Sequence, residues 1–423
     1  MPESSCGASS PSPGKPLSPD DHDILIITLR TGFPSGMAAT RRVLLIARAL
    51  QEGGANPAVI HMNTSETSEP FRNHEVCGIY DGIPFEYACG RVDRPRSFLA
   101  RRVRTFLGFL RTCRLVAEGA ASGRLRAVLF YERSIFSLLP ILMLCREQGI
   151  NFALDLVEWP VAMEANQGAL GRLSLRLYRK VALPMADRIT AISRFLLDRS
   201  REIRRSAETV MYLPVLAAPD GLPAERRPVP GRLVLSISGG YSRELTLVLE
   251  AFSLVVESHP EAELHITGGL DEMNLSRIVG TGAEAATVSP EALKRVRCRG
   301  YLPRDELLNL FSTGCAAVAA LEDDLRSLSR MPTKIAEYTF SGLPLVAGSI
   351  GDVTETFVDG LTAFMYSPGD RDSLAGAMLR VLEDPERAEA VGIAGKRLAL
   401  ATFSYGNYSA ELKPFLLNEG EPC

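Results

Sequence analysis

The chain lacks the patterns that mark metal sites, disulfide frameworks and membrane spans. Its 423 residues include 8 cysteines, but none forms a C-x-x-C pair or stands at a metal-ligand spacing. With no signal-peptide pattern either, we expect reduced thiols, no bound metal and a cytoplasmic location. No apolar run reaches the roughly 18 residues of a membrane span. The longest, Ile135 to Leu144, contains Pro140 and is predicted to be a buried helix.

A strong charge of either sign is also missing. The sequence has 47 basic and 50 acidic residues, a net charge of −3 and a pI near 6.1. This balance gives no reason to expect a nucleic-acid partner. The hydrophobic content of 46% and the charged content of 23% are ordinary for a soluble globular protein. At this length we expect two domains.

Strands and amphipathic helices alternate along the chain, which predicts two parallel-sheet α/β domains. We expect a disordered Ser/Pro/Gly-rich tail at 1–21, a first domain at 22–212 and a Pro-rich linker at 213–231. A second domain is expected at 232–402, with 403–423 packing back towards the first domain. Ligands of such parallel sheets bind at the carboxyl ends of the strands.

Continuous apolar runs predict the strands, and helical periodicity predicts the helices. Expected strands are Asp23–Leu29, Ala58–Met62, Ala127–Phe130, Asn151–Leu156, Arg188–Ala191, Arg232–Ser238, Glu263–Thr267, Arg295–Arg299, Ala316–Ala320, Leu345–Ala347 and Ala363–Tyr366. Expected helices are Thr40–Gln51, Ser134–Gln148, Gly168–Val181, Arg243–Ser258, Arg304–Ser312, Pro332–Ser341 and Ser373–Glu383.

One predicted helix carries a lysine where helices prefer an anion. The stretch from Pro332 reads PTKIAEYTFSGLPLV, with Pro at the helix start and Gly342 just past its end. Lys334 in the first turn opposes the helix dipole, so its ammonium and the free N–H groups together would suit a phosphate. Glu337 lies on the same helix face and could accept hydroxyl groups. The alternative is a solvated Lys–Glu pair.

Several segments, taken in order, resemble a GT-B glycosyltransferase of retaining family 4, in a branch with a P-x-K-x-x-E-Y pattern. They are TGFPSGMAATRRVLLIARALQEGG, SISGGYSRELTLVLEAF, HITGG, CRGYLPRDELLNLF, PTKIAEYTFSGLPLVAG and DGLTAFMYSPGD. The resemblance covers nearly everything after residue 22. It implies two Rossmann-like domains facing across a cleft, with a nucleotide sugar bound by the second.

The resemblance places donor contacts on this helix and on the loop before it. The family usually carries two glutamates separated by seven residues. The second falls on Glu337, which is implied to bind the ribose hydroxyls. The first falls on Ser329, which cannot accept as an anion. Lys334 and the backbone of Thr333 would then carry part of donor binding, and the loop at Tyr301 would contact the base.

The phosphate loop of the second domain also departs from the family. One of its two usual basic positions holds Arg243, whose guanidinium could bind the diphosphate in two hydrogen bonds. The other is lost to SGG, where Gly239 and Gly240 offer backbone N–H groups. The alternative for Arg243 is an ordinary residue at a helix start.

In the first domain, Ser35 and Gly36 fall where the family has a glycine loop near the donor phosphate and the acceptor. Arg41 and Arg42 open the next helix and face either the cleft or solvent. We take Arg41 as a candidate acceptor contact.

A cluster at the end of a first-domain strand suggests acceptor binding. Where the family often has a histidine near the reacting sugar, this chain has Val157. Around it lie Asp155, Glu158 as a candidate base, and Trp159, which could stack on a sugar. The alternative is a capping Asp and a core Trp.

Two tempting signals are set aside. Asp323 and Asp324 resemble a metal-binding pair, but GT-B enzymes stabilise the leaving diphosphate with helix dipoles and basic residues, so we read a solvated loop and expect no cofactor. His265 lies within a strand and is read as structural.

The segment from Arg91 to Arg114 is rich in arginine, with Asp93 its only acidic residue, and its apolar residues recur near helical spacing. Such a helix could lie on anionic lipid at the cytoplasmic face, or pack on the protein with its arginines solvated.

Together the residues and the resemblance predict a retaining, metal-independent transfer of a sugar from a UDP- or GDP-sugar. The acceptor would be a hydroxyl of a glycan or lipid-linked molecule, in polysaccharide or glycoconjugate biosynthesis. Two alternatives stay open. One is a catalytically silent GT-B binding or scaffold protein, because Ser329 replaces a usual glutamate. The other is a GT-B epimerase, which would need several acid/base side chains.

Overall fold

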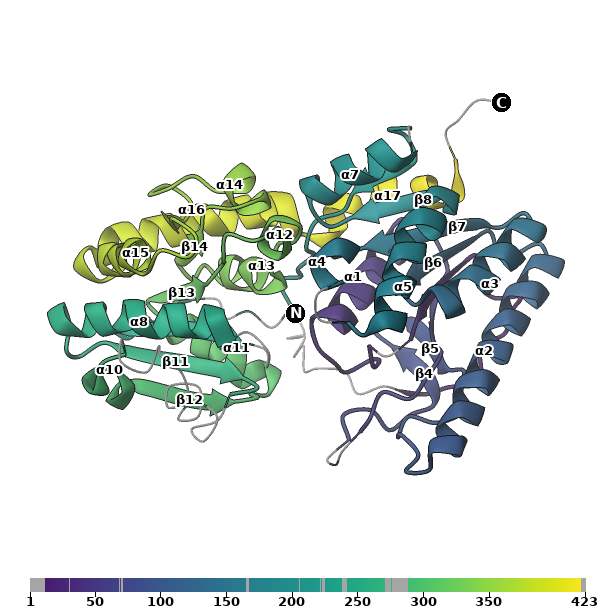
Figure 1. The fold of residues 1–423 in the computed structure, drawn as a ribbon, viewed down its shortest axis with the longest axis horizontal. Coiled ribbons are helices and arrows are strands. Elements are labelled where there is room, and N and C mark those ends of the chain that lie inside the picture. The colour runs from purple at the N-terminus through teal and green to yellow at the C-terminus, as the bar shows by residue number, and fades with distance from the viewer. Residues whose placement is uncertain are drawn as a thin grey trace, which may run out of the picture. The chain divides into compact units, whose positions relative to one another are not determined.

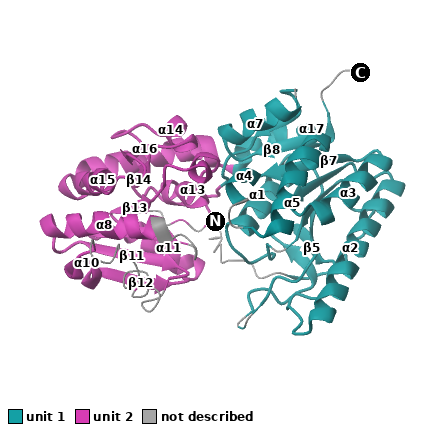
Figure 2. Cartoon of the chain, viewed as in Figure 1, with its two compact units in different colours: residues 1–216, 405–423 teal, residues 217–404 magenta. Residues whose placement is uncertain are grey.

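The computed structural model describes residues 12–29, 31–67, 69, 71–164, 167–204, 206–220, 222, 225–237, 242–270, 275 and 288–419, without the side chains of 164, 242 and 243. The chain forms two compact units, residues 1–216 with 405–423 (unit 1) and residues 217–404 (unit 2), shown in Figure 2. Each unit is a parallel-sheet α/β domain, so the predicted fold class is confirmed (Figure 1).

In the described part of unit 1 the sheet has nine strands, in the order β1-β4-β5-β3-β2-β6-β7-β8-β9. Only β4 runs antiparallel to its neighbours. Strands β2 and β3 are buried at every residue, which is why they read as continuous apolar runs. The strands are β1 Ser12–Pro13, β2 Ile24–Thr28, β3 Pro57–His61, β4 Cys77–Tyr80, β5 Ile83–Tyr87, β6 Ala127–Tyr131, β7 Asn151–Leu156, β8 Arg188–Ala191 and β9 Val210–Tyr212.

The helices of unit 1 include two at the carboxyl end of the chain. These two, η3 and α17, contact α1. The hydroxyl of Tyr405 in η3 accepts a hydrogen bond from Arg48 in α1 at 2.9 Å. The helices are α1 Ala38–Glu52, α2 Phe98–Ala121, α3 Ile135–Glu147, α4 Pro160–Glu164, α5 Ala169–Leu177, the π-helical turn η1 Tyr178–Ala182, α6 Leu183–Met185, α7 Arg194–Arg204, η3 Tyr405–Tyr408 and α17 Ser409–Leu417.

In the described part of unit 2 the sheet has six parallel strands, in the order β12-β11-β10-β13-β14-β15. The strands are β10 Arg232–Ile237, β11 Glu263–Gly268, β12 Val296–Gly300, β13 Ala316–Ala319, β14 Leu345–Gly348 and β15 Phe364–Tyr366. The helices are α8 Ser242–Ser258, α10 Pro290–Lys294, α11 Arg304–Thr313, α12 Leu325–Leu328, α13 Thr333–Phe340, α14 Asp352–Thr356, α15 Arg371–Glu383 and α16 Pro385–Phe403.

Each sheet has a point at which the chain returns from one edge to begin filling the other side. In unit 1 this point lies between β2 and β6, and in unit 2 between β10 and β13. Open α/β sheets bind ligands outside the carboxyl ends of the strands at such a switch point, because the flanking connections diverge there. The loop after β2 and the start of α8 are therefore the places to look for sites.

Two of the parts of unit 1 that differ from the sequence prediction lie together at one edge of its sheet. Residues 12–21, expected to be disordered, include β1, which pairs with β4. Leu17 is buried, and its N–H donates to the Glu86 carboxylate at 2.7 Å. The hairpin of β4 and β5 was not predicted, because the residues CGIY of β4 show no continuous apolar run.

A buried ion pair joins several elements of unit 1. Arg42 in α1 donates to both carboxylate oxygens of Asp155 in β7, at 2.6 and 2.8 Å, and Thr190 in β8 donates to the same carboxylate. Arg42 also donates to the carbonyl oxygens of Leu213 and Pro214. Although burial disfavours its charge, Asp155 raises the pKa of Arg42. A buried pair of this kind is tolerated because its hydrogen-bonding groups find partners.

We predict that Arg42→Ala strongly destabilises unit 1, because it leaves the Asp155 carboxylate buried and uncompensated. The expected loss is about 3–5 kcal/mol in the free energy of unfolding, measured by urea denaturation. The control is Arg199→Ala, whose ion pair with Glu202 is exposed on α7 and is expected to contribute about 1 kcal/mol or less. Equal losses in both variants would contradict the assignment.

Candidate functional site

Helix α13 is fixed against the switch point of unit 2. Its apolar face, including Ile335 and Phe340, is buried. The hydroxyl of Tyr338 accepts a hydrogen bond from the N–H of Ser236 in β10 at 2.8 Å. A helix that connects two parallel strands runs antiparallel to them. The first turn of α13 therefore lies towards the carboxyl ends of the strands. Pro332 has no side-chain oxygen to cap this first turn, and the N–H groups at a helix start are the ones that a ligand can bind.

Lys334 lies in this first turn and is partly buried. Burial lowers the pKa of its ammonium to about 8, while the nearby Glu337 carboxylate acts in the opposite direction. The helix dipole also disfavours a cation here. An anion bound at the start of α13 would offset both the desolvation of the ammonium and its unfavourable interaction with the helix dipole. The ammonium is therefore suited to bind a phosphate.

Glu337 is held by a residue that the sequence did not indicate. Its Oε1 accepts from Nη1 of Arg304 at 2.9 Å, and the two side chains are 26% and 37% exposed. Arg304 is the first residue of α11, which follows β12 and Tyr301. The carboxylate is therefore oriented but still accessible to a hydroxyl group.

A second cation lies next to this helix. Arg330 faces Glu244 in the first turn of α8 at 3.7 Å, with both side chains largely buried. The pair connects the segment before α13 to the start of α8. Gly239, Gly240 and the side chain of Arg243 lie outside the described residues, and Arg243 itself is the second residue of α8.

The remaining predicted donor residues differ in accessibility. Tyr301 is exposed, and Thr333 is partly buried as the first residue of α13. Ser329 is fully buried at the end of α12, where its hydroxyl donates to the Arg326 carbonyl oxygen at 3.2 Å. A direct contact of Ser329 with a donor sugar does not fit this burial, because the hydroxyl is not presented to a ligand.

The loop after β2 carries Gly36, which only glycine can occupy. A Cβ there would lie 2.0 Å from Oγ1 of Thr40 and 2.8 Å from the Thr31 carbonyl oxygen. The Thr40 hydroxyl donates to that carbonyl oxygen at 2.6 Å. Gly36 is exposed, and Arg41 is a partly buried neighbour in α1. The loop therefore approaches the first turn of α1 closely and presents its backbone outwards.

Side chains far along the sequence hold this loop from one side. The N–H of Gly32 donates to Nε2 of His61 at 2.7 Å. Burial lowers the pKa of His61 to about 4, so the ring is a neutral acceptor near pH 7. The Tyr87 hydroxyl lies 2.9 Å from the Phe33 nitrogen and 3.0 Å from the Phe33 oxygen.

A second set of hydrogen bonds holds the loop at Ser35. Asn73 accepts from the Ser35 N–H and donates to the Ser35 carbonyl oxygen, both at 2.8 Å, and it also donates to Oε1 of Glu66 at 2.6 Å. Ser65, whose hydroxyl lies 2.9 Å from that of Tyr87, donates to the same oxygen. Burial raises the pKa of Glu66, but these hydrogen bonds and one from the Arg72 N–H outweigh burial and lower it. Two chains of hydrogen bonds therefore link the loop to the Glu66 carboxylate. One runs through Tyr87 and Ser65, and the other runs through Asn73.

The predicted acceptor cluster on β7 is mostly structural. Asp155 is buried against Arg42, so its assignment to acceptor binding is corrected to a structural role. Trp159 is 8% exposed and packs edge-on against Phe195 at 6.2 Å, which leaves little of its ring for stacking on a sugar. Glu158 is partly exposed and pairs with Arg133 at 2.8 Å.

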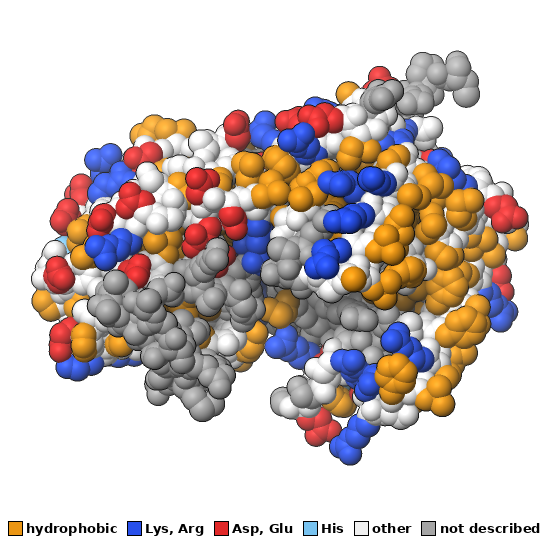
Figure 3. Space-filling view, in the orientation of Figure 1, with side chains coloured by type: hydrophobic (Ala, Val, Ile, Leu, Met, Phe, Trp, Pro, Cys, Tyr) orange, Lys and Arg blue, Asp and Glu red, His pale blue; other side chains and the backbone are white. Residues whose placement is uncertain are grey.

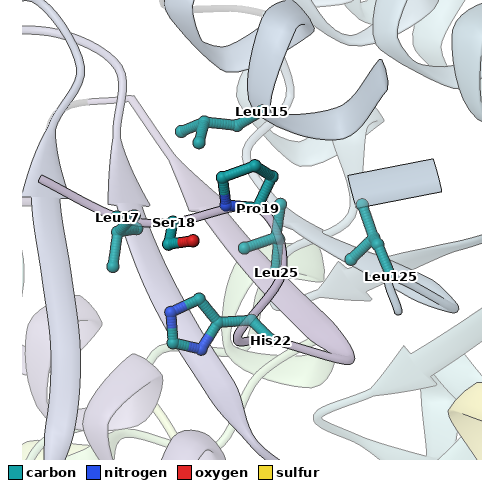
Figure 4. A pocket seen from close by; sticks show the side chains of 7 residues that line it. All are labelled: Leu17, Ser18, Pro19, His22, Leu25, Leu115 and Leu125. Atoms are coloured by element: carbon teal, nitrogen blue, oxygen red, sulfur yellow. The ribbon is translucent and has the colours of Figure 1, made fainter. Parts of the chain in front are cut away.

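Other polar features do not form a site. Asp324 caps α12 by accepting from the Ser327 N–H, and His265 pairs with Glu263 while almost fully buried. Among the described residues no group of three His, Cys, Asp or Glu side chains is placed to hold a metal ion. A small cavity in unit 1 is lined mainly by leucines and His22 (Figure 4), and it contains none of the predicted site residues.

Known proteins match the chain in two ways. Residues 232–384 match the family of glycosyl transferases group 1. Over 85 residues the chain is 35% identical to a GDP-mannose-dependent alpha-(1-6)-phosphatidylinositol monomannoside mannosyltransferase of Mycolicibacterium smegmatis, covering 20% of this chain and 22% of that protein. Over 177 residues it is 27% identical to a GDP-mannose-dependent monoacylated alpha-(1-6)-phosphatidylinositol monomannoside mannosyltransferase of Corynebacterium glutamicum, covering 41% and 43%. These matches span less than half of either relative.

Solved structures match nearly the whole chain. A sucrose-phosphate synthase from Thermosynechococcus elongatus has a TM-score of 0.66 at 16% identity, covering 91% of this chain and 96% of that one. Anabaena Alr3699/HepE in complex with UDP and glucose has a TM-score of 0.66 at 14% identity, covering 94% and 100%. The chain therefore has the GT-B fold, and the match to group 1 glycosyl transferases is confined to residues 232–384.

We predict that Tyr87→Phe loosens the loop after β2, because the Phe33 amide loses its acceptor. Hydrogen exchange of the 31–36 backbone should accelerate by about tenfold, as expected for one lost buried hydrogen bond. Asn73→Ala should do the same through Ser35. Tyr301→Phe, in unit 2, is the control. Unchanged exchange in both unit 1 variants would show that the loop does not depend on these side chains.

Proposed function

We propose that this chain transfers a sugar from a nucleoside-diphosphate sugar to an acceptor hydroxyl, with retention at the anomeric carbon. The first turn of α13 carries the proposal. There Lys334 is desolvated beside Glu337 at the switch point of unit 2, within the stretch that matches group 1 glycosyl transferases. Two relatives are named for GDP-mannose, and one solved neighbour holds UDP and glucose, which supports a GDP- or UDP-linked donor.

Each donor-site residue has a separate role in this proposal. Lys334 and Arg243 stabilise the negative charge that develops on the leaving diphosphate. Backbone N–H groups at Gly239, Gly240 and Thr333 add to this, since helix starts and glycine loops bind phosphate. A divalent ion is not needed in this arrangement. Glu337, oriented by Arg304, binds the ribose hydroxyls, and the Tyr301 loop contacts the base.

Unit 1 contributes the acceptor side in this proposal. The ordered backbone at Gly36 faces the acceptor, with Arg41 and the Glu158–Arg133 pair as further polar contacts. The acceptor is a hydroxyl of a glycan or lipid-linked molecule. Contact of residues 91–114 with the cytoplasmic face of a membrane would bring the protein to a lipid-linked acceptor.

A catalytically silent donor-binding protein is the second candidate. The observation that favours it is the burial of Ser329, which leaves the position of a usual family glutamate without a group that reaches a ligand. The two candidates share donor binding and differ in turnover. Release of nucleoside diphosphate from a donor in the presence of acceptor separates them.

We predict that UDP or GDP at millimolar concentration raises the melting temperature, because a ligand that binds only the native state stabilises it. Lys334→Gln should remove most of the shift, since the ammonium is the charged group at the start of α13. The matched control is Lys294→Gln, an exposed lysine of unit 2 paired with Glu291, which should keep the full shift. The donor-site assignment fails if neither nucleotide shifts the wild type, or if both variants behave alike.

We predict different kinetic effects for two donor-site substitutions, assayed in EDTA with the donor that binds. Arg243→Ala should lower kcat by about 10²-fold with little change in KM, because its contact strengthens as the diphosphate leaves. Glu337→Ala should mainly raise KM, because ribose binding is shared by the ground and transition states. Full activity in both would place the site elsewhere. Loss of all wild-type turnover in EDTA, restored by Mg²⁺, would show that a metal ion takes part.

A further inference from the structure

Three neighbouring helices of unit 1 expose large apolar side chains. Ten of the nineteen large hydrophobic residues exposed in the described part of the chain lie on them. Helix α2 contacts α3, and α3 contacts α5. Figure 3 shows apolar side chains gathered over these helices, with basic ones between them. We call this set the apolar face: Phe98, Leu99, Val103, Phe106, Leu107 and Leu110 of α2, Phe136 and Met143 of α3, and Leu170 and Leu173 of α5.

The first ten residues of α2 pack little against the rest of the protein. The helix spans 24 residues, but its buried residues start only at Gly108. Residues 98–107 therefore add little to the core, although they include four large apolar side chains with more than 45% of their surface exposed: Phe98 62%, Leu99 70%, Val103 48% and Phe106 59%. A concentration of this kind marks an interaction surface, because scattered single residues are the norm on a soluble protein.

The charge of these helices is one-sided. They contain eight arginines, and their two acidic residues, Glu118 and Glu147, stand near the carboxyl ends of α2 and α3. Arg102, Arg172 and Arg176 are exposed. The guanidinium groups of Arg101 and Arg102 lie over the Phe98 ring, at 5.8 and 5.0 Å from its centre. Guanidinium groups stack on aromatic faces in this way, so basic and apolar groups lie side by side on this surface.

We propose that the apolar face docks flat on an anionic lipid bilayer. Apolar side chains would enter the boundary between headgroups and acyl chains, and the arginines would contact lipid phosphates. A second copy of the chain fits less well, because a two-fold interface would set these arginines against each other. No helix in the described ranges is long and apolar enough to cross a membrane. The surface extends the contact proposed for residues 91–114 to α3 and α5, and only its purpose, access to a lipid-linked acceptor, rests on the proposed function.

The test is binding of the full chain to vesicles, which requires no sugar transfer. Phosphatidylcholine vesicles with about one third phosphatidylglycerol should bind the wild type at low salt, and added salt should weaken binding. One variant removes the exposed apolar groups of α3 and α5 and leaves α2 unchanged. It combines Phe136→Gln, Met143→Gln, Leu170→Gln and Leu173→Gln. This variant should bind at least about tenfold more weakly, because apolar burial drives insertion.

The matched control replaces exposed apolar residues of unit 2, Leu361→Gln and Ile393→Gln, and should bind like the wild type. Equal melting temperatures would show that all variants are folded, as expected for exposed positions. Wild-type protein that ignores anionic vesicles at low salt overturns the proposal, as does a concentration-dependent dimer that forms through this face instead. Binding of the α3 and α5 variant that equals binding of the wild type would limit the contact to α2 and contradict the three-helix surface. None of these outcomes bears on nucleotide binding.

Discussion

The account of unit 2 depends on one unfavourable placement, the ammonium of Lys334 in the first turn of α13. Burial lowers its pKa to about 8, and the helix dipole opposes its charge as well. The surrounding structure holds it there, because Tyr338 fastens α13 to β10 and the apolar face of the helix is buried. A desolvated ammonium gains more electrostatic free energy from a bound anion than an exposed lysine does. This is the physical reason to place a diphosphate at this helix.

Unit 1 also contains buried charges, but those of Arg42, Asp155 and Glu66 already have partners within the protein. Arg42 and Asp155 fix α1 to β7 and β8, and α1 in turn carries Thr40, which closes the loop at Gly36. Glu66 orders the same loop through Ser65, Tyr87 and Asn73. Side-chain hydrogen bonds therefore hold the loop at the switch point of unit 1 in one conformation. A preorganised loop loses less entropy on binding, which suits a substrate contact.

The sequence predicted the elements far better than the contacts between them. Apolar runs such as Ile24–Thr28 identify buried strands. The helix that carries Lys334 is identified by the Pro at its start and the Gly just past its end. Arg304, Arg330 and Glu66 were missed, because each acts on a residue in another element, and no local pattern reports such a pair. Asp155 was misassigned for a related reason. A carboxylate near the end of a strand reads the same in sequence whether it faces a ligand or a buried arginine.

The most direct measurement of the central claim is proton uptake when UDP or GDP binds. Because burial lowers the pKa of Lys334 to about 8, its side chain is partly deprotonated near pH 8 in the free protein, and a bound diphosphate should raise this pKa. Calorimetric titrations in two buffers of different ionisation enthalpy should then show uptake of a fraction of a proton by the wild type at pH 8. Uptake should fall at pH 6 and be lost in Lys334→Gln. Tight binding at pH 8 with no proton uptake, or with equal uptake in Lys334→Gln, would contradict a diphosphate bound at Lys334.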